Sequence, residues 1–210
     1  MRTFLYTFIV FCAFVFALPV SAQKKDKTII TQTVDAAGFS SICMEVVGSI
    51  RFTPSETYSV VIEGPAFYVK KLFVEVSKGK LIINTHSKNG NNGNKIKNVV
   101  IRISAPTLDK VEIDGVGSFV CEKKLTAKDF KASMSGVGRI SIKDLVCKSA
   151  RFEMDGVGNI DAVVDCKGKL VADCCGVGKI TVSGTAGSVS ISKSEFVGHV
   201  NSKNLRVEDN

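Results

Sequence analysis

The chain has 210 residues, of which 45% are hydrophobic, so it is long and apolar enough to bury a sizeable core in one domain. Its formal net charge of +8 would suit an acidic glycan or an anionic surface, or would serve only solubility. It has only two histidines and no C-x-x-C spacing, so we expect no metal and no cofactor, and no motif supports a nucleic-acid partner.

Residues 1–22 have the pattern of a secretory signal peptide. Arg2 supplies a positive start, an apolar run follows it, and small residues then form a cleavage pattern. The apolar run is short for a bilayer span, which disfavours the alternative of a membrane anchor. We therefore expect an exported protein, in the periplasm or on the cell surface, with no transmembrane segment in residues 23–210.

Residues 28–110 contain several short runs of alternating apolar and polar residues, which is typical of strands. Residues 87–98 are rich in asparagine, glycine and lysine, and this composition predicts a mobile loop. No linker separates this half from residue 111. We therefore expect residues 23–210 to form one domain, in which residues 28–110 make irregular first turns.

Residues 111–205 repeat a five-residue phrase, Gly-Val-Gly-x-Ile or a close variant. The second glycines are Gly117, Gly138, Gly158, Gly178 and Gly198, so the steps are 21, 20, 20 and 20 residues. A constant period near 20 is typical of a chain that stacks one small unit on itself. The alternative, an antiparallel meander, is less attractive because the units lack Asn-Gly turns.

Alignment of the copies at the second glycine gives columns of similar residues. Two positions after it stand Phe119, Ile140, Ile160, Ile180 and Val200, and eight positions after it stand Leu125, Val146, Cys166 and Ala186. Apolar and polar columns alternate with a period of two, which predicts strands with one buried face. We expect an all-β, single-stranded parallel β-helix, right-handed, with about 20 residues per turn.

Two further columns flank the second glycine. The valines that precede it are predicted to fill the interior, and they are Val116, Val137, Val157, Val177 and Val197. The residues that follow it are polar and are predicted to form an outward ligand-binding face, and they are Ser118, Arg139, Asn159, Lys179 and His199.

Six cysteines follow the predicted signal peptide, and they are Cys43, Cys121, Cys147, Cys166, Cys174 and Cys175. An even number of cysteines in an exported protein could form a disulfide framework. However, Cys121, Cys166 and Cys174 occupy columns that isoleucine, valine and methionine fill elsewhere. We expect these three thiols to act as small buried hydrophobic groups, and the redox state of the six stays open.

Catalytic motifs are absent, since the chain has no G-x-S-x-G, no H-E-x-x-H and no Walker loop. Asp114 and Asp155 share an outward column, and parallel β-helices also include polysaccharide lyases, so a lyase or hydrolase is one alternative. The repetition argues against it, because an active site requires one unique arrangement of side chains. We therefore expect no catalytic residues.

The Gly-Val-Gly-x-Ile copies resemble the head GIN domain of auto-transporter adhesins. The entry Phe39-Ser40-Ser41-Ile42 and the segment Ile103-Ser104-Ala105-Pro106-Thr107-Leu108 carry the same resemblance, which covers about residues 30 to 200. The resemblance implies an exported β-helical domain of a bacterial envelope, of a kind common in Bacteroidetes. It implies adhesion or surface binding and supplies no catalytic residues.

The sequence thus favours an exported, non-enzymatic, adhesin-like protein that presents a repeated polar face to a glycan or another envelope component. The alternatives are the lyase or hydrolase and a structural or assembly protein of the envelope. In the last case open ends of the stack would pair between subunits, because uncapped strand edges associate readily.

Overall fold

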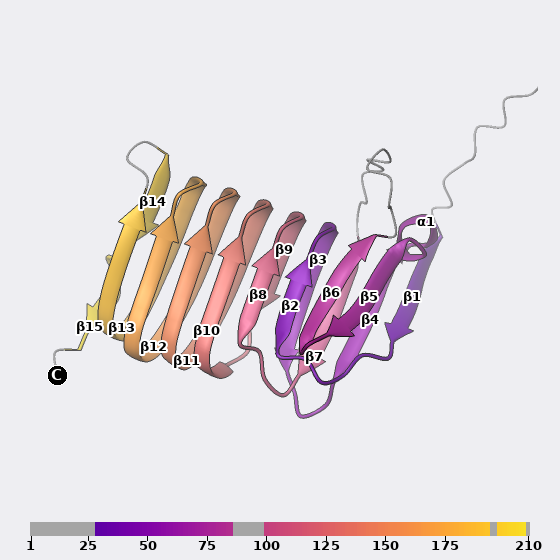
Figure 1. Cartoon of the computed structure of the whole chain (residues 1–210), viewed down its shortest axis with the longest axis horizontal. Coiled ribbons are helices and arrows are strands. Elements are labelled where there is room, and N and C mark those ends of the chain that lie inside the picture. Colours follow the sequence, from indigo (N-terminus) through magenta and orange to yellow (C-terminus); the bar gives the residue numbers. More distant parts are fainter. Residues whose placement is uncertain (1–27, 86–98, 194–196, 209–210) are drawn as a thin grey trace, which may run out of the picture.

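The computed structural model describes residues 28–85, 99–193 and 197–208, and the predicted signal peptide and the predicted loop at residues 87–98 lie outside these ranges. The described strands stack around a common axis as a parallel β-solenoid of about five turns, about 20 residues apart (Figure 1). The predicted all-β parallel β-helix is therefore confirmed. In the described ranges no helix has the length and hydropathy of a membrane span.

The regular turns comprise eight strands that follow one another along the chain. They are β8 (Lys110–Ile113), β9 (Val116–Cys121), β10 (Leu125–Met134), β11 (Val137–Met154), β12 (Val157–Cys174), β13 (Val177–Lys193), β14 (Gly198–Asn201) and β15 (Leu205–Val207). The β11–β12 pairing shifts register after Ile142 and after Cys147. In this pair the two shifts separate three segments, and we call residues 137–142 the first side of the turn and residues 150–154 the third side.

Equivalent inward residues lie directly above one another. Phe119 pairs with Ile140, which pairs with Ile160 and then with Ile180, and all four are fully buried. Ladders of this kind fill the interior with isoleucine, phenylalanine, methionine and alanine, and the described residues include no buried charged or polar side chain. Burial on the order of 25 cal/mol per Å² of apolar surface therefore stabilises every turn against its two neighbours.

The prediction that Val146 points inward was wrong. In the structure Cys147, and not Val146, lies beside Cys166 on the next turn. The reason is that the corner after the first side is one residue shorter in β11 than in the preceding turn, where Leu125 pairs with Leu145. A fixed offset therefore crosses to the opposite face of the strand.

The strands of the N-terminal half continue the same stack, but some of them run antiparallel to their neighbours. Its strands are β1 (Ile29–Val34), β2 (Ser41–Met44), β3 (Val47–Pro54), β4 (Ser59–Pro65), β5 (Leu72–Ser77), β6 (Lys80–Thr85) and β7 (Val100–Ala105). Strand β3 pairs in parallel with β9 and β7, and β2 pairs in parallel with β8 and β6. Strands β1, β4 and β5 are antiparallel to their neighbours, which the repeat pattern did not indicate.

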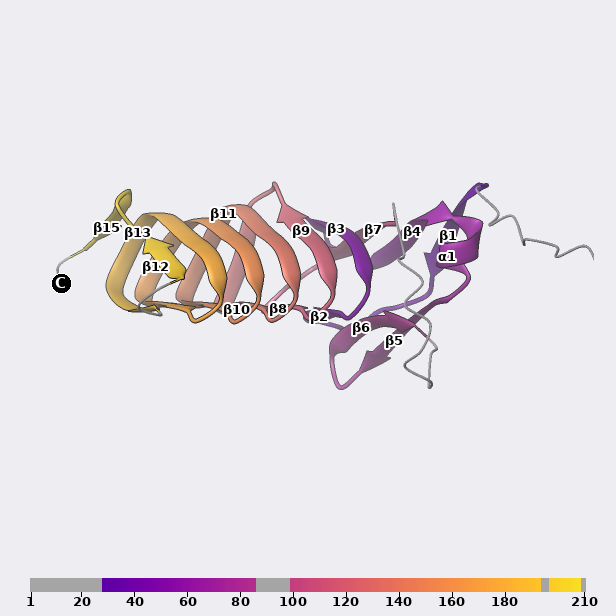
Figure 2. The ribbon, with the colours of Figure 1, turned by 90° about the horizontal axis from the view of Figure 1, so that it is seen from above.

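The first and the third sides of the coil separate at the N-terminal end (Figure 2). One side ends in β4 and β1, and the other ends in the β5–β6 hairpin, whose turn holds Lys78 and Gly79 at positive φ. The short helix α1 (Ala66–Val69) lies at this end and buries its alanine and its last valine. The helix thereby closes part of the apolar core where the regular stacking stops.

The cysteines are unbridged in the described residues. Cys121, Cys166 and Cys174 are buried, as predicted for small hydrophobic groups in the inward columns. Cys43 and Cys147 are buried as well, whereas Cys175 is exposed at a corner.

Candidate functional site

A row of half-exposed valines runs along one corner of the solenoid, and the prediction that it fills the interior was wrong. We call it the valine strip, and it consists of Val47, Val116, Val137, Val157, Val177 and Val197. Between 46% and 54% of each of the last five side chains is exposed. The valine and the buried isoleucine of each copy are three positions apart, and an odd separation in a strand places two side chains on opposite faces.

Glycines on both sides of Val116, Val137, Val157 and Val177 fix the corner in four copies. A Cβ atom on Gly156 would lie 1.9 Å from the carbonyl oxygen of Gly136, and one on Gly158 would lie 1.9 Å from that of Gly138. The turns therefore approach so closely at this corner that no side chain fits there. As a result the valine is the one side chain that projects from the corner in these four copies.

The polar column predicted from the repeats lies beside the valine strip. Its members are in register from turn to turn, and they are Ser118, Arg139, Asn159, Lys179 and His199. We call this row the polar ladder. Ser49 extends it by one turn, because the Ser118 hydroxyl donates a hydrogen bond to the Ser49 hydroxyl at 3.0 Å. Arg139 lies 3.8 Å from Asp161 in an exposed ion pair, which leaves its guanidinium largely available.

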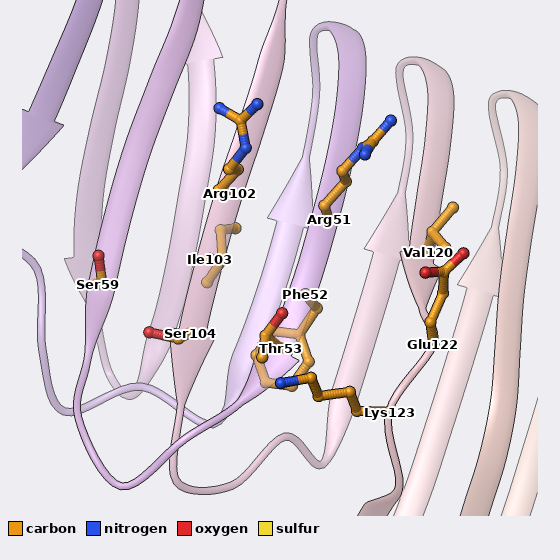
Figure 3. Close-up of a pocket in the computed structure, with 10 residues that line it drawn as sticks. All are labelled: Arg51, Phe52, Thr53, Ser59, Arg102, Ile103, Ser104, Val120, Glu122 and Lys123. Atoms are coloured by element: carbon orange, nitrogen blue, oxygen red, sulfur yellow. The ribbon is translucent and has the colours of Figure 1, made fainter.

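A concave region opens on the first side of the N-terminal turns, at the end of the polar ladder (Figure 3). Its volume is about 500 Å³, within the ~300–1,000 Å³ of typical ligand sites. We call it the basic groove, and its lining is Arg51, Phe52, Thr53, Ser59, Arg102, Ile103, Ser104, Val120, Glu122 and Lys123. Strand β3 carries Ser49 of the extended polar ladder and, two residues later, Arg51 of the groove.

Sequence reasoning did not find the basic groove. Its residues come from β3, β4, β7, β9 and the corner after β9, and the antiparallel insertion of β4 beside β7 brings Ser59 next to Ser104. The one available signal was Arg51, which comes two residues after Ser49 in Val47-Gly48-Ser49-Ile50, a segment similar to the repeated phrase. Arg102 could not be placed beside it without the β3–β7 register.

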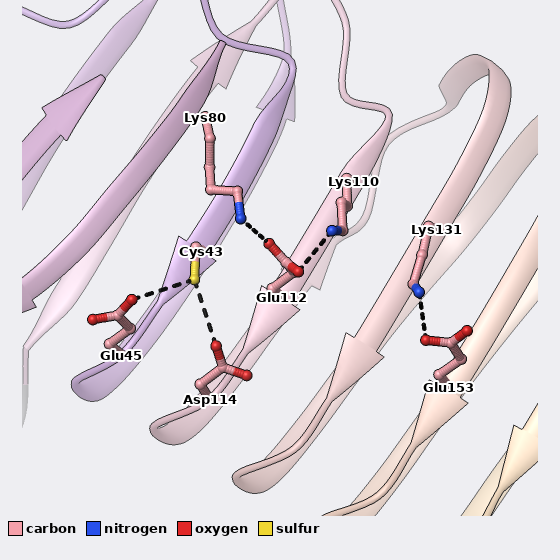
Figure 4. Close-up of polar contacts among 8 residues, drawn as sticks. All are labelled: Cys43, Glu45, Lys80, Lys110, Glu112, Asp114, Lys131 and Glu153. Carbon is pink, nitrogen blue, oxygen red and sulfur yellow. Dashed lines mark hydrogen bonds and ion pairs between the residues drawn. The ribbon is translucent and has the colours of Figure 1, made fainter. Parts of the chain in front are cut away.

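The third side of the coil carries a different set of charges, which are paired with one another (Figure 4). Glu112 accepts hydrogen bonds from the ammonium groups of Lys80 and Lys110, at 2.6 and 2.7 Å. Two turns along the stack from Glu112, Glu153 pairs with Lys131 and with Arg151. Because these charges satisfy one another across neighbouring strands, this side offers fewer free groups to a ligand than the polar ladder does.

The electrostatics of Glu112 follow from these contacts. Partial burial alone would raise its pKa, but the hydrogen bonds from Lys110 and Lys80 outweigh burial and hold the pKa below the ordinary value of 4.5. The hydrogen bond to Glu112 in turn raises the pKa of Lys80. Both residues are therefore charged at neutral pH and stabilise the pairing of β6 with β2 and of β2 with β8.

Cys43 lies beside this cluster and could be considered as a nucleophile. Its thiol donates weak hydrogen bonds to Asp114, at 3.7 Å, and to Glu45, at 3.9 Å. Burial and the negative charge of nearby carboxylates raise the pKa of Cys43 to about 12. The thiol is consequently protonated at neutral pH, and a protonated thiol is a poor nucleophile.

The lyase or hydrolase alternative would use Asp114 and Asp155 of one outward column. The register places Ser135 on the turn between them. In the part of the chain that the structure describes, no three His, Cys, Asp or Glu side chains gather closely enough to hold a metal ion. The two carboxylates therefore lie in the same outward column but two turns apart.

Comparisons with known proteins agree on the fold. A putative adhesin from Bacteroides fragilis is 23% identical, with a TM-score of 0.57 over 85% of this chain and 98% of that one. A "putative lipid binding protein" from Parabacteroides distasonis is 19% identical, with a TM-score of 0.72 over 85% of this chain and 75% of that one. No curated protein matches. A family profile matches residues 38–210, so the chain belongs to the family described as "Putative auto-transporter adhesin, head GIN domain".

Proposed function

We propose that the protein is an exported, non-enzymatic, adhesin-like protein that binds an extended polysaccharide of a cell surface. The valine strip and the polar ladder together form the binding surface. The observation that carries the proposal is their register, since each turn adds one valine and one polar side chain to two straight parallel rows.

The spacing of the rows fits a polymer better than it fits a small ligand. Neighbouring turns of the coil are about 4.8 Å apart, which is close to the length of one pyranose ring in an extended chain. Each ring could place its apolar C–H face on a valine and direct its hydroxyls to the polar ladder. Serine and asparagine side chains supply both donors and acceptors for such hydrogen bonds, and lysine supplies donors.

The chemistry of the surface favours binding over catalysis. The same corner geometry recurs on every regular turn, whereas catalysis needs one nucleophile or acid–base pair in a unique setting. Membership of the adhesin family supports the same assignment and supports export to the envelope. A repeated surface with a weak site on each turn gains affinity when several turns engage one polymer at once.

A binding assay on a panel of immobilised neutral and acidic polysaccharides tests the proposal. The triple variant Val137→Thr, Val157→Thr, Val177→Thr keeps β-branched side chains but removes an apolar methyl group from three turns. Its affinity should fall at least about ten-fold, because buried methyl groups contribute to binding. The matched control is Val163→Thr, since Val163 is 44% exposed but lies away from the strip.

The variant Arg139→Ala, Lys179→Ala tests the polar ladder in the same assay. This variant should also bind polysaccharide more weakly than wild type. If both the triple valine variant and this double variant bind with wild-type affinity, the corner is not the binding surface. Concentration-dependent self-association in light scattering, with no binding to any polysaccharide, would favour an assembly protein of the envelope instead.

A further inference from the structure

The basic groove holds two arginines on neighbouring strands, and the fold neutralises only one of them. Arg51 and Arg102 are direct register partners on the parallel strands β3 and β7, and both side chains are exposed on the same face. Neighbouring strands are only about 4.8 Å apart, so the two guanidinium groups repel each other unless an anion lies between or above them. Arg102 is paired with Glu63, whereas no described acidic residue forms an ion pair with Arg51.

The remaining walls of the groove add a third cation and a set of hydroxyl groups. Lys123 is directed from the corner after β9 toward β3 (Figure 3), and no described acidic residue forms an ion pair with it. The next outward residues below the arginines are Thr53 and Ser104, which are register partners, and Ser59 pairs with Ser104 from the other side. The serine and threonine side chains of this row are shorter than the arginine and lysine side chains around them, and this difference in length makes the surface concave.

The Ser104 hydroxyl donates to the carbonyl oxygen of Thr57 at 3.0 Å, which fixes its orientation and leaves its oxygen lone pairs toward the groove. The only acidic residue of the lining is Glu122, against three cations. A guanidinium binds a carboxylate or sulfate with two parallel hydrogen bonds, and hydroxyl groups suit the hydroxyls of a sugar ring. The lining thus combines anion recognition with sugar recognition in one cavity.

We propose that the basic groove binds the anionic group of an acidic sugar, such as a uronic acid unit, with Arg51 and Lys123 on the anion and the serine and threonine row on the ring hydroxyls. This deepens the proposed function, on which it rests for the polysaccharide class of the ligand. The groove lies on the same side as the polar ladder, at its N-terminal end, so one polymer could occupy both. An acidic unit in the groove would then set the position of the chain along the ladder.

The test measures affinity for polygalacturonate, for dextran sulfate and for neutral dextran by isothermal titration calorimetry. Arg51→Gln and Lys123→Gln should each weaken binding of an acidic polymer about ten-fold, because each removes a charge-assisted hydrogen bond. Both side chains are exposed, so these variants should unfold at the wild-type temperature. Loss of polygalacturonate binding identifies a carboxylate ligand, and loss of dextran sulfate binding identifies a sulfate ester.

The matched control is Arg206→Gln, which removes the same charge from an exposed position on β15 at the opposite end of the coil. Its affinity for both acidic polymers should stay at the wild-type value. Equal affinity of wild type and Arg51→Gln for both acidic polymers would overturn the proposal. Equal losses of affinity in Arg51→Gln and Arg206→Gln would overturn it too, because they would indicate nonspecific attraction between the basic protein and the acidic polymer. The valine-strip variant, measured in parallel, separates failure of the groove from failure of the strip.

Discussion

Gly158 shows at the scale of one residue why the repeated phrase needs its second glycine. Its φ is +145°, a region that residues with a side chain rarely adopt. A Cβ atom there would also lie 1.9 Å from a backbone oxygen of the turn before, and backbone in the middle of a stack cannot move aside without breaking the ladder. The two constraints together explain why this position is glycine in every copy.

The substitution Gly158→Ala should therefore destabilise the protein by at least about 3 kcal/mol, since it combines backbone strain with overpacking. Gly79→Ala is the matched control, because Gly79 also has a positive φ, +75°, but has no atom within 4 Å of a new Cβ. The control should cost only about 1 kcal/mol. Urea denaturation followed by circular dichroism measures both values. Similar losses of unfolding free energy in the two variants would mean that the close approach of the turns does not add to the cost of the substitution.

The elements were predictable wherever one register held along the whole repeat. Isoleucines two positions after the glycine pointed inward, because the first side of every turn has the same length. The period-two pattern could not indicate the antiparallel direction of β4, since alternation looks the same in both directions. The same reasoning applies to the candidate site. The polar ladder could be predicted from equal offsets in the repeat, whereas the basic groove depends on pairings between strands that are distant in the sequence.

The ion pairs of the third side are a further property of the elements, and they predict a pH dependence. The folded-state pKa of Glu112 lies below its ordinary value of 4.5. A carboxylate with a lowered pKa contributes stability that is present above its unfolded pKa and is lost as the pH falls through the folded pKa. Its partner Lys110 lies on the same strand, β8, and its partner Lys80 lies on β6, on the far side of β2, so this contribution holds β6, β2 and β8 together.

Glu112→Gln should accordingly lower the free energy of unfolding by about 1 kcal/mol at pH 7. The difference from wild type should close as the pH falls from 4.5 through the lower folded-state pKa of Glu112, because wild-type Glu112 is then protonated too. Glu75→Gln on β5 is the control, since Glu75 is exposed and forms no ion pair with a described residue, and it should change little at any pH. A difference for Glu112→Gln that stays undiminished throughout an acid titration of the folded protein would contradict the electrostatic origin.

The whole molecule is a stack in which most contacts join one turn to the next. Strand β12 is paired along its length with β11 on one side and β13 on the other. Among the described strands, β1 is paired only with β4, and β15 only with β13 over three residues. In such a nearest-neighbour architecture, local stability depends on the number of neighbours, and opening should begin at the ends.

Hydrogen exchange followed by mass spectrometry should therefore give a gradient of protection along the axis. Amides of β11 and β12 should exchange slowest, and those of β15 and β1 fastest, although all four strands have hydrogen-bonded amides. The variant Gly158→Ala should accelerate exchange most in β11 and β12 and less in the β5–β6 hairpin, because the disturbed contact lies between the two central turns. Uniform protection from β1 to β15 would show that the coil opens only as one cooperative unit, and a maximum at either end would place the most stable turns outside the regular repeats.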